Sequence, residues 1–272
     1  METMKEKKNK TVLITGISSG IGKALAHEFA AEGYDLIGVA KEEDSLRKAS
    51  SELENKHGIT VKVISKDLAK DGAAQEVYDE IRSWNTTVNI LVNDAGVGQR
   101  GNFVDIAPAK YSEIIHLNVM SLTHLTRLFL QDMVDRNEGK IMNLGSVAGF
   151  QPGPLLAVYH ATKAFVVSLS EAIATELEEM DSEVTVTCLC PGPTDTNFFS
   201  RADMEGTNVV EHKDKLMLQP EEVAKGAYKA LMDGERIFIP GGMNKVTTFI
   251  RRVIPKSTQS KMQMKYYEKK EE

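Results

Sequence analysis

Short apolar runs alternate with longer amphipathic stretches along the whole chain. The short runs predict buried strands at 11–15, 35–40, 60–65, 89–93, 140–144, 184–189 and 236–239. Between them, apolar residues recur at helical spacing and predict helices at 21–32, 45–56, 72–84, 108–134, 158–179 and 221–232. Parallel strands need crossover connections, and those crossovers cover both faces of the sheet. The alternation therefore predicts an α/β fold, with one doubly wound parallel sheet of about seven strands and helices on both faces, in a single domain.

Three segments do not follow the alternation. Residues 1–10 are a polar extension that leads straight into a strand, without the apolar stretch of a secretory signal. The irregular residues 194–219 lie inside the domain at 11–242, and a loop of that length predicts a lid over a binding site. Residues 243–272 are basic and amphipathic, which suits an anionic membrane surface or a place across the binding cleft. Pro255 interrupts any long lipid-facing helix and favours a solvated extension that closes the domain.

Composition narrows the class of protein. A chain of 272 residues with 42% hydrophobic and 26% charged residues is typical of a soluble globular protein. Its net charge of −6 gives no reason to expect a nucleic acid partner. Cys188 and Cys190 fit a buried strand without a disulfide, and the scattered histidines predict no metal site. No run of about 18 apolar residues occurs, so we expect no transmembrane helix and a cytoplasmic protein.

A glycine turn follows the first predicted strand directly. Gly16, Gly20 and Gly22 stand in the sequence TGISSGIG, which opens the first predicted helix. A turn without side chains lets a pyrophosphate approach, and a helix N-terminus offers N–H groups and a favourable dipole to the anion. The placement of the turn between a strand and a helix predicts a dinucleotide site.

The end of the second strand decides which dinucleotide is expected. An acidic residue there would hold the ribose hydroxyls, whereas a basic residue would receive a 2′-phosphate. The strand ends at Ala40 and Lys41 follows, while Ser18 in the glycine turn supplies a further hydroxyl donor. The sequence therefore favours NADP(H). NAD(H) is the alternative, because Glu42 and Glu43 follow closely.

A tyrosine and a lysine lie four residues apart in a predicted helix. At this spacing Tyr159 and Lys163 face the same side, and the ammonium group could lower the pKa of a phenol that otherwise ionises near pH 10. Tyr266 and Lys270 have the same spacing but no companions. Ser146, by contrast, follows a strand at the edge where doubly wound sheets bind ligands. These residues predict a proton-transfer site in which Ser146 holds the reacting oxygen, although a serine there can also cap the strand end.

The ordered motifs resemble those of the classical short-chain dehydrogenases/reductases, from residue 11 to about residue 240. TGISSGIG is similar to the family's TGxxxGxG turn, NDAG at 93–96 to its NNAG element, and PGPTDT at 191–196 to its nicotinamide-side loop. Asp94 stands where the family has a second asparagine. The resemblance implies a Rossmann-type fold. It also implies cofactor contacts from Gly16, Ser18, Ser19, Gly20, Ile21, Gly22, Lys41, Asp67, Leu68, Asn93, Ala95, Gly96, Tyr159, Lys163, Pro191, Gly192 and Thr196.

The same resemblance implies a catalytic tetrad of Asn118, Ser146, Tyr159 and Lys163. Taken alone, Asn118 in its apolar helical stretch reads as a hydrogen-bonded core amide. The family implies instead that it holds a water linked to Lys163 and completes a proton relay to solvent. The implied activity is NAD(P)-dependent interconversion of a carbonyl and an alcohol by hydride transfer, with Tyr159 as general acid and base.

The substrate and the partners are less sharply defined by sequence. Apolar residues at 151–155 and at Phe198, Phe199 and Met204 favour a hydrophobic substrate, such as a steroid, an acyl group or another bulky ketone or alcohol. The family implies a homodimer or homotetramer that uses the helices at 108–134 and 158–179. Two alternatives remain: a regulatory dinucleotide-binding protein without catalysis, and an interaction protein that acts through its basic tail, for example at a membrane surface.

Overall fold

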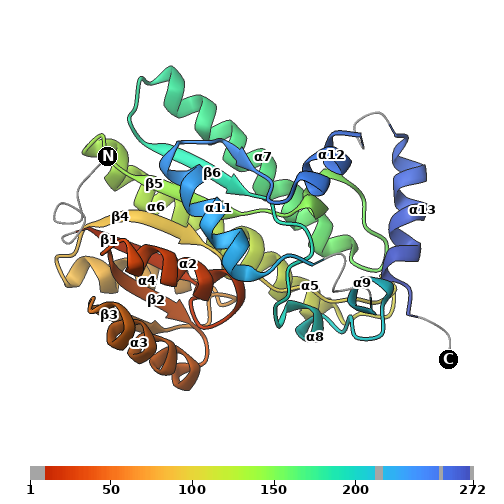
Figure 1. Ribbon diagram of the computed structural model, residues 1–272, viewed down its shortest axis with the longest axis horizontal. Coiled ribbons are helices and arrows are strands. Elements are labelled where there is room, and N and C mark those ends of the chain that lie inside the picture. Colours follow the sequence, from red (N-terminus) through yellow and green to blue (C-terminus); the bar gives the residue numbers. More distant parts are fainter. Residues whose placement is uncertain (1–9, 212–216, 251–253, 270–272) are drawn as a thin grey trace.

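The computed structural model describes residues 10–211, 217–250 and 254–269 (Figure 1). Within these residues, parallel strands form one sheet in the order β3-β2-β1-β4-β5-β6-β7. The strands are β1 (Thr11–Thr15), β2 (Asp35–Ala40), β3 (Val61–Ser65), β4 (Val88–Asn93), β5 (Lys140–Leu144), β6 (Thr185–Leu189) and β7 (Ile237–Phe238). The predicted doubly wound parallel sheet in a single domain is confirmed, and most strand ends fall within a residue of their predicted positions.

Helices cover both faces of the sheet. One face carries α2 (Gly20–Ala31), α3 (Glu43–His57) and α11 (Pro220–Met232), and the other carries α4 (Ala73–Ser83), α6 (Leu122–Asp135) and α7 (Ala157–Glu179). Successive residues of β1 serve different cores: Val12 packs with Phe29 on the first face, and Leu13 packs with Phe129 on the second. A strand buried on both faces is apolar throughout, which explains why the strands could be predicted from short apolar runs in the sequence.

The helix predicted at 108–134 is not regular along its length. It consists of α5 (Pro108–Ile115), a π-helical segment η1 (His116–Ser121) and α6. The π segment buries the polar side chains of Asn118 and Ser121. Apolar periodicity does not reveal a π turn, since one extra residue per turn shifts the helix face without interrupting the helical pattern.

The order of the strands reverses between β1 and β4, and ligands bind at such switch points in doubly wound sheets. The remaining elements gather at this end of the sheet in Figure 1: η2 (Val147–Phe150), α8 (Phe198–Arg201), α9 (Asn208–Glu211), α12 (Gly242–Ile250) and α13 (Lys256–Tyr267). The segment 194–219, predicted to be irregular, thus contains two short helices, α8 and α9, within its described residues. A parallel bridge between Thr194 and Leu218 joins the two ends of this segment.

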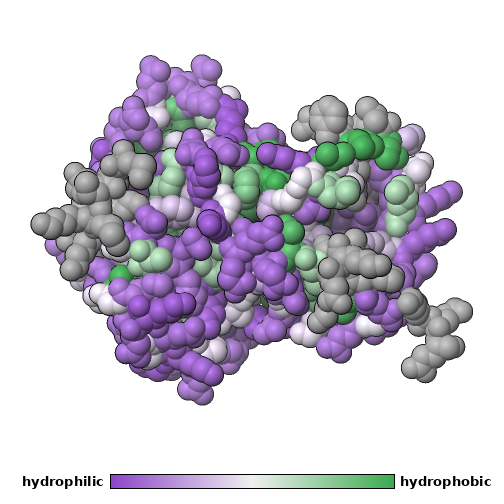
Figure 2. Space-filling model, viewed as in Figure 1, coloured by the Kyte–Doolittle hydropathy of each residue, from purple (hydrophilic) through white to green (hydrophobic). Residues whose placement is uncertain are grey.

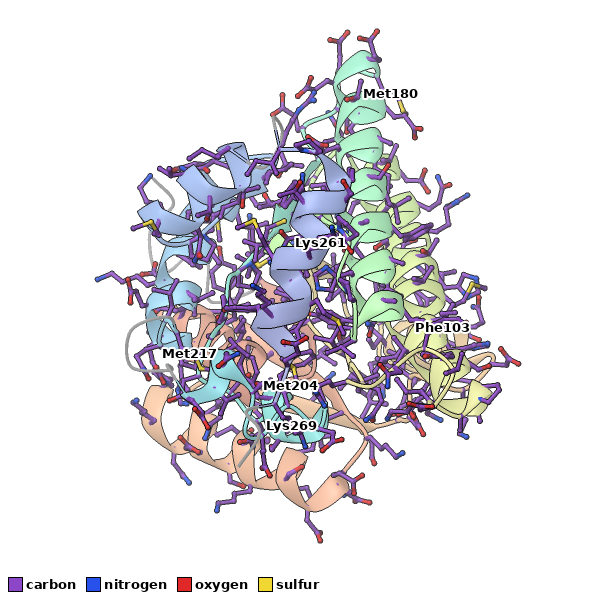
Figure 3. The ribbon with its side chains drawn as sticks, turned by 90° about the vertical axis from the view of Figure 1, so that its right-hand side faces the viewer. Phe103, Met180, Met204, Met217, Lys261 and Lys269 are labelled. Atoms are coloured by element: carbon purple, nitrogen blue, oxygen red, sulfur yellow. The ribbon has the colours of Figure 1, made fainter. Side chains whose placement is uncertain are left out.

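The C-terminal helix α13 packs against α9. Gln259, Gln263 and Tyr267 point inward at a spacing of four residues and are buried. In Figure 3, α13 crosses the front of the molecule between α7 and the segment that carries Met204. Two of these three buried residues are glutamines, so the buried face of α13 cannot be recognised from apolar periodicity. Among the described residues, no helix combines the length and the apolar character needed to cross a membrane.

Candidate active site

A cavity of about 710 Å³ lies at the carboxyl ends of the strands. Its lining includes most of the predicted cofactor contacts, namely Gly16, Ser18, Ser19, Gly20, Ile21, Lys41, Asp67, Leu68, Ala95, Gly96, Tyr159, Pro191, Gly192 and Thr196. Gly22, Asn93 and Lys163, which were also predicted as contacts, are not part of the lining. The structure therefore brings residues of the glycine turn, of the NDAG element and of the 191–196 loop to a single cavity with Lys41, Asp67 and Tyr159.

The glycine turn has the shape that an anionic ligand requires. Gly16 has a φ of +79°, and a Cβ at Gly22 would lie 2.6 Å from the Gly16 carbonyl oxygen. A side chain at either position would strain the turn or force its two ends apart. The turn leads directly into α2, whose first N–H groups are free of helical partners. The residues present thus fit the phosphates of a dinucleotide.

Asn93 supports the site from behind. Its Nδ2 donates hydrogen bonds to Thr126 Oγ1 at 3.0 Å and to Asn143 Oδ1 at 2.9 Å. These contacts join β4 to α6 and β5 and explain why the side chain does not reach the cavity. The neighbouring backbone is fixed as well, because the N–H groups of Asp94 and Ala95 both donate to Thr15 Oγ1.

The end of the cavity beside β2 carries two lysines, Lys41 and Lys66, among acidic residues that include Glu42 and Asp67. Lys41 Nζ lies 3.1 Å from Asp67 Oδ2, and this hydrogen bond raises the pKa of Lys41. Lys66 and Ser45 line the same end and were not predicted from the sequence. Lys66 directly follows β3 and precedes Asp67, so its position in the sequence indicates that it lies near the predicted adenine end of the cofactor site. Lys66 pairs with Glu76 at 2.7 Å, as Lys41 does with Asp67, so both lysines that lie where a 2′-phosphate is expected are ion-paired within the protein.

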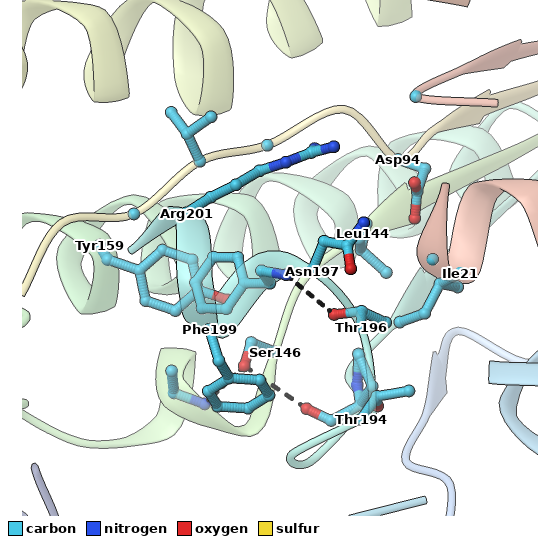
Figure 4. Close-up of a pocket in the computed structure, with 18 of the residues that line it drawn as sticks. Ile21, Asp94, Leu144, Ser146, Tyr159, Thr194, Thr196, Asn197, Phe199 and Arg201 are labelled. Carbon is cyan, nitrogen blue, oxygen red and sulfur yellow. Dashed lines mark hydrogen bonds between the residues drawn. The ribbon is translucent and has the colours of Figure 1, made fainter. Parts of the chain in front are cut away.

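Ser146 and Tyr159 line the cavity together (Figure 4). Ser146 follows β5, accepts a hydrogen bond from the Ala148 N–H at 3.1 Å and so also caps η2. Tyr159 lies in the first turn of α7, with its ring centre 5.0 Å from that of Phe198. The predicted convergence of the serine and the tyrosine at one strand end is present in the structure, and the capping role of Ser146 coexists with it.

Lys163 does not lower the pKa of Tyr159 as the four-residue spacing predicted. Burial raises the pKa of Tyr159 to about 12, although a hydrogen bond with Ser146 opposes the shift. Lys163 Nζ donates to the Leu144 carbonyl oxygen at 2.6 Å and lies 5.8 Å from the centre of the tyrosine ring. Burial also lowers the pKa of Lys163 to about 8. The ammonium group is thus directed at the end of β5 and leaves the phenol protonated.

Asn118 is held by hydrogen bonds within the protein. Its Oδ1 accepts from the Val97 N–H and its Nδ2 donates to the Val97 carbonyl oxygen, both at 2.9 Å. Nδ2 also donates to Thr162 Oγ1 at 3.1 Å. A Cβ at Gly96 would lie 3.3 Å from Asn118 Oδ1 and 3.6 Å from Lys163 Nζ, so the two side chains border the same glycine. The water relay implied by the family remains a prediction.

Several contacts at the site gave no signal in the sequence. His160, to which the sequence assigned no role, lies within hydrogen-bonding distance of the Gln151 carbonyl oxygen (2.9 Å) and of Tyr267 Oη (3.1 Å). Arg100 Nε donates to the Tyr267 carbonyl oxygen at 2.6 Å. These bonds fix the end of α13 beside Tyr159. Partners more than a hundred residues apart cannot be paired from one sequence.

Comparison with known proteins places the chain in a family. The sequence model of the short chain dehydrogenase family matches residues 10–205. The oxidoreductase YvrD of Bacillus subtilis (strain 168) is 35% identical over 187 residues, 69% of each chain. The very-long-chain 3-oxoacyl-CoA reductase of Anas platyrhynchos is 34% identical over 170 residues, 60% of this chain. The match covers only 54% of that reductase.

Solved structures agree with this placement. A short-chain dehydrogenase from Sphingobium yanoikuyae in complex with NADPH superposes with a TM-score of 0.78 at 30% identity, over 90% of this chain and 96% of that one. A short chain dehydrogenase/reductase from Burkholderia phymatum in complex with NAD gives a TM-score of 0.80 at 25% identity, over 91% and 94% of the two chains. The fold and the cavity define a dinucleotide-binding oxidoreductase. The chain belongs to the short-chain dehydrogenase family.

Proposed function

We propose that the protein is an NADP(H)-dependent oxidoreductase that interconverts a carbonyl and an alcohol in a bulky apolar substrate. The observation that carries this proposal is the meeting of Ser146 and Tyr159 in the same cavity as the glycine turn. A bound nicotinamide would supply or accept the hydride. Consumption of NADPH with a panel of bulky ketones and acyl thioesters tests the proposal. NADPH that binds without being consumed by any carbonyl would favour the regulatory alternative.

The chain's own residues supply the proton chemistry. With a pKa of about 12, the phenol of Tyr159 is protonated at neutral pH and is competent to donate its proton to a developing alkoxide. The hydroxyl of Ser146 is placed to hydrogen-bond the same oxygen. Asn118 Nδ2 donates to Thr162 Oγ1, which in turn donates to the Tyr159 carbonyl oxygen, so this pair supports the turn of α7 that carries the tyrosine.

The preference for NADP(H) is supported by the charge at the end of the cavity beside β2. Lys41 and Lys66 line that end, and Lys41 is 63% exposed, so it can turn from Asp67 to a phosphate at little cost. Glu42 lines the same end and would oppose a phosphate. Solved relatives bind either NADPH or NAD, so the proposal rests on these lysines.

Replacement of Lys41 by alanine should therefore weaken NADPH binding and leave NADH binding nearly unchanged. A hydrogen bond to a charged group contributes about 1.5–3 kcal/mol, which corresponds to roughly a 10- to 150-fold increase in the Kd of NADPH. Fluorescence titration with both dinucleotides measures the change. Lys23→Ala is the matched control, because Lys23 pairs with Glu52 and does not line the cavity. An equal loss for NADH and NADPH would contradict the assignment.

The other end of the cavity is mostly apolar, with Gln151, Arg201 and Gln263 as polar exceptions, and it suits a bulky substrate. Its walls come from α7, the segment 194–219 and the two C-terminal helices, with Leu156, Phe198, Phe199, Met204, Val209, Met243, Met262, Tyr266 and Tyr267. Tyr267 is held in place by His160 and Arg100, so α13 forms a fixed wall. The kinship with very-long-chain 3-oxoacyl-CoA reductases supports an acyl substrate, and the shape equally accommodates other bulky carbonyl compounds.

Phe199→Ala should lower kcat/KM for a bulky apolar substrate by roughly 10- to 150-fold, since removal of one buried aromatic contact removes about 1.5–3 kcal/mol of apolar burial. A small ketone, which does not reach this wall, should be turned over at the wild-type rate. Phe103→Ala is the matched control, because Phe103 is 63% exposed and does not line the cavity. Equal losses for small and bulky substrates would show that Phe199 supports the fold and does not select substrate.

Two surfaces support the predicted partners. Ile115 at the end of α5, Met120 on η1 and Phe165 on α7 are exposed, and the family's subunit contact was predicted on these helices. Sedimentation of the wild-type protein tests for a dimer or tetramer.

Met243, Val246 and Ile250 expose an apolar face of α12, visible in green in Figure 2. This face borders the cavity mouth and supports the predicted membrane contact, which flotation with anionic vesicles tests. Arg251 and Arg252 of the predicted basic tail lie outside the described residues.

A further inference from the structure

Asp94 is a buried acid beside the glycine turn. It directly follows β4, is 9% exposed and belongs to the lining of the cavity. Its carboxylate packs against the glycine turn. A Cβ at Gly22 would lie 2.5 Å from Asp94 Oδ2, and a Cβ at Gly16 would lie 2.9 Å from the same atom. Figure 4 shows the side chain next to Ile21 at the start of α2. A carboxyl group thus lies at the helix end that fits a phosphate.

The hydrogen bonding of Asp94 is incomplete. The Gly22 N–H donates to its carboxylate, but Oδ1 is buried and has no hydrogen-bond partner among the described residues. A buried carboxylate with an unsatisfied oxygen is costly in its charged form. Burial raises the pKa of Asp94 to about 7, although Lys163 and the Gly22 N–H both act to lower it. The group therefore changes charge within the physiological range.

The groups that face Asp94 come from the elements packed around it. Thr15 of β1 accepts the Asp94 N–H, and α2 contributes the Gly22 N–H. On α7, the Asp94 charge opposes the lowering of the Lys163 pKa by burial and adds to the raised pKa of Tyr159. Lys163 is the cation that acts on Asp94 within the described part of the chain. When Asp94 is ionised, its negative charge balances the positive charge of Lys163. The two residues together then give no net attraction for an anionic ligand.

We propose that Asp94 is a proton-linked determinant of dinucleotide affinity: its neutral carboxyl admits the anionic cofactor at the glycine turn, and its carboxylate opposes the cofactor. This inference rests on the proposed function, because it concerns the same dinucleotide site. An ionised Asp94 occupies the Gly22 N–H and places a negative charge beside the site of the phosphates. By linkage, cofactor binding must favour the protonated acid to the same extent as protonation favours the cofactor.

The test is the Kd of NADPH for the wild type and for Asp94→Asn, measured by fluorescence titration from pH 5.5 to pH 9, about 1.5 units below and 2 units above the pKa of Asp94. Titration of the cofactor phosphate affects both proteins, so the informative quantity is the ratio of the wild-type Kd to the variant Kd, which reports the Asp94 charge together with its effect on Lys163. We expect the ratio of the wild-type Kd to the Asp94→Asn Kd to be near one at pH 5.5. At pH 9 the wild type should bind NADPH about tenfold or more weakly than the variant, as is typical of coupling between two sites. Asp94→Ser replaces the asparagine variant if that variant does not fold.

Asp132→Asn provides the matched control, since Asp132 bonds Tyr78 between α4 and α6 and does not line the cavity. Its ratio to the wild type should stay near one at every pH. A wild-type to Asp94→Asn ratio that is constant with pH would overturn the proposed role of Asp94 and leave the dinucleotide site intact. Absence of saturable NADPH binding by the wild type at any pH would overturn the proposed function and this inference together.

Discussion

Tyr159→Phe should lower kcat/KM for carbonyl reduction by about 10²- to 10⁴-fold, the range that general acid–base catalysis contributes. The phenol is protonated at neutral pH and lines the cavity beside Ser146, so its loss removes the proton donor while the cavity keeps its shape. The phenylalanine ring preserves the contact with Phe198, whose centre lies 5.0 Å from that of the tyrosine ring. The Kd of NADPH should therefore change little. Steady-state kinetics and fluorescence titration of the same preparation measure the two quantities.

The matched control for this variant is Tyr78→Phe. Tyr78 also loses a hydrogen-bonded hydroxyl, which contacts Asp132 at 3.0 Å, but it lies between α4 and α6 and does not line the cavity. Its kcat/KM should remain at the wild-type value. Wild-type activity in Tyr159→Phe would remove Tyr159 from the proton-transfer role, whereas a large loss in Tyr78→Phe would indicate that loss of a buried hydroxyl acts through stability.

Gly22→Ala should strongly weaken dinucleotide binding. The added Cβ would lie 2.6 Å from the Gly16 carbonyl oxygen and 2.5 Å from Asp94 Oδ2, so the turn must shift away from the start of α2. Insertion of a methyl group into a closely packed site costs about 1–3 kcal/mol, which corresponds to roughly a 5- to 150-fold increase in Kd if the shift is borne by the binding site. Titration with NADPH measures this change, and circular dichroism verifies the fold.

Gly242→Ala is a suitable control for Gly22→Ala. Neither glycine needs a positive φ, and a Cβ at Gly242 would meet no atom within 4 Å. This variant should bind NADPH as the wild type does. Unchanged affinity in Gly22→Ala would mean that the glycine turn is needed for packing but is not the phosphate site.

Much of the fold was predictable because burial on both faces makes each strand apolar throughout. Val12 and Leu13 belong to different cores, yet both are required to be apolar, and the same holds along β2 and β4. The convergence of Ser146 and Tyr159 was predictable for a related reason. Parallel strands end at one edge of the sheet, so residues that follow strands and open the next helices meet there.

The features that escaped prediction depend on the direction of a side chain or on long-range contacts. Lys163 could reach the tyrosine by its spacing, but its ammonium group bonds the Leu144 carbonyl oxygen instead. His160 meets Tyr267 across 107 residues of sequence. The sequence shows Asp94 in place of the family's second asparagine, but it does not show that this carboxylate is buried against the glycine turn. In each case the local pattern allowed several environments, and the tertiary packing selects one.

The most direct test of the proposed activity is NADPH consumption by the wild type and by Tyr159→Phe, over a panel of 3-oxoacyl thioesters, steroid ketones, other bulky ketones and small aldehydes. We expect the wild type to consume NADPH with at least one bulky apolar carbonyl compound and to prefer NADPH to NADH. We expect Tyr159→Phe to lose this activity while it still binds NADPH. Wild-type protein that binds NADPH tightly but consumes none with any member of the panel, or a variant as active as the wild type, would contradict the proposed activity.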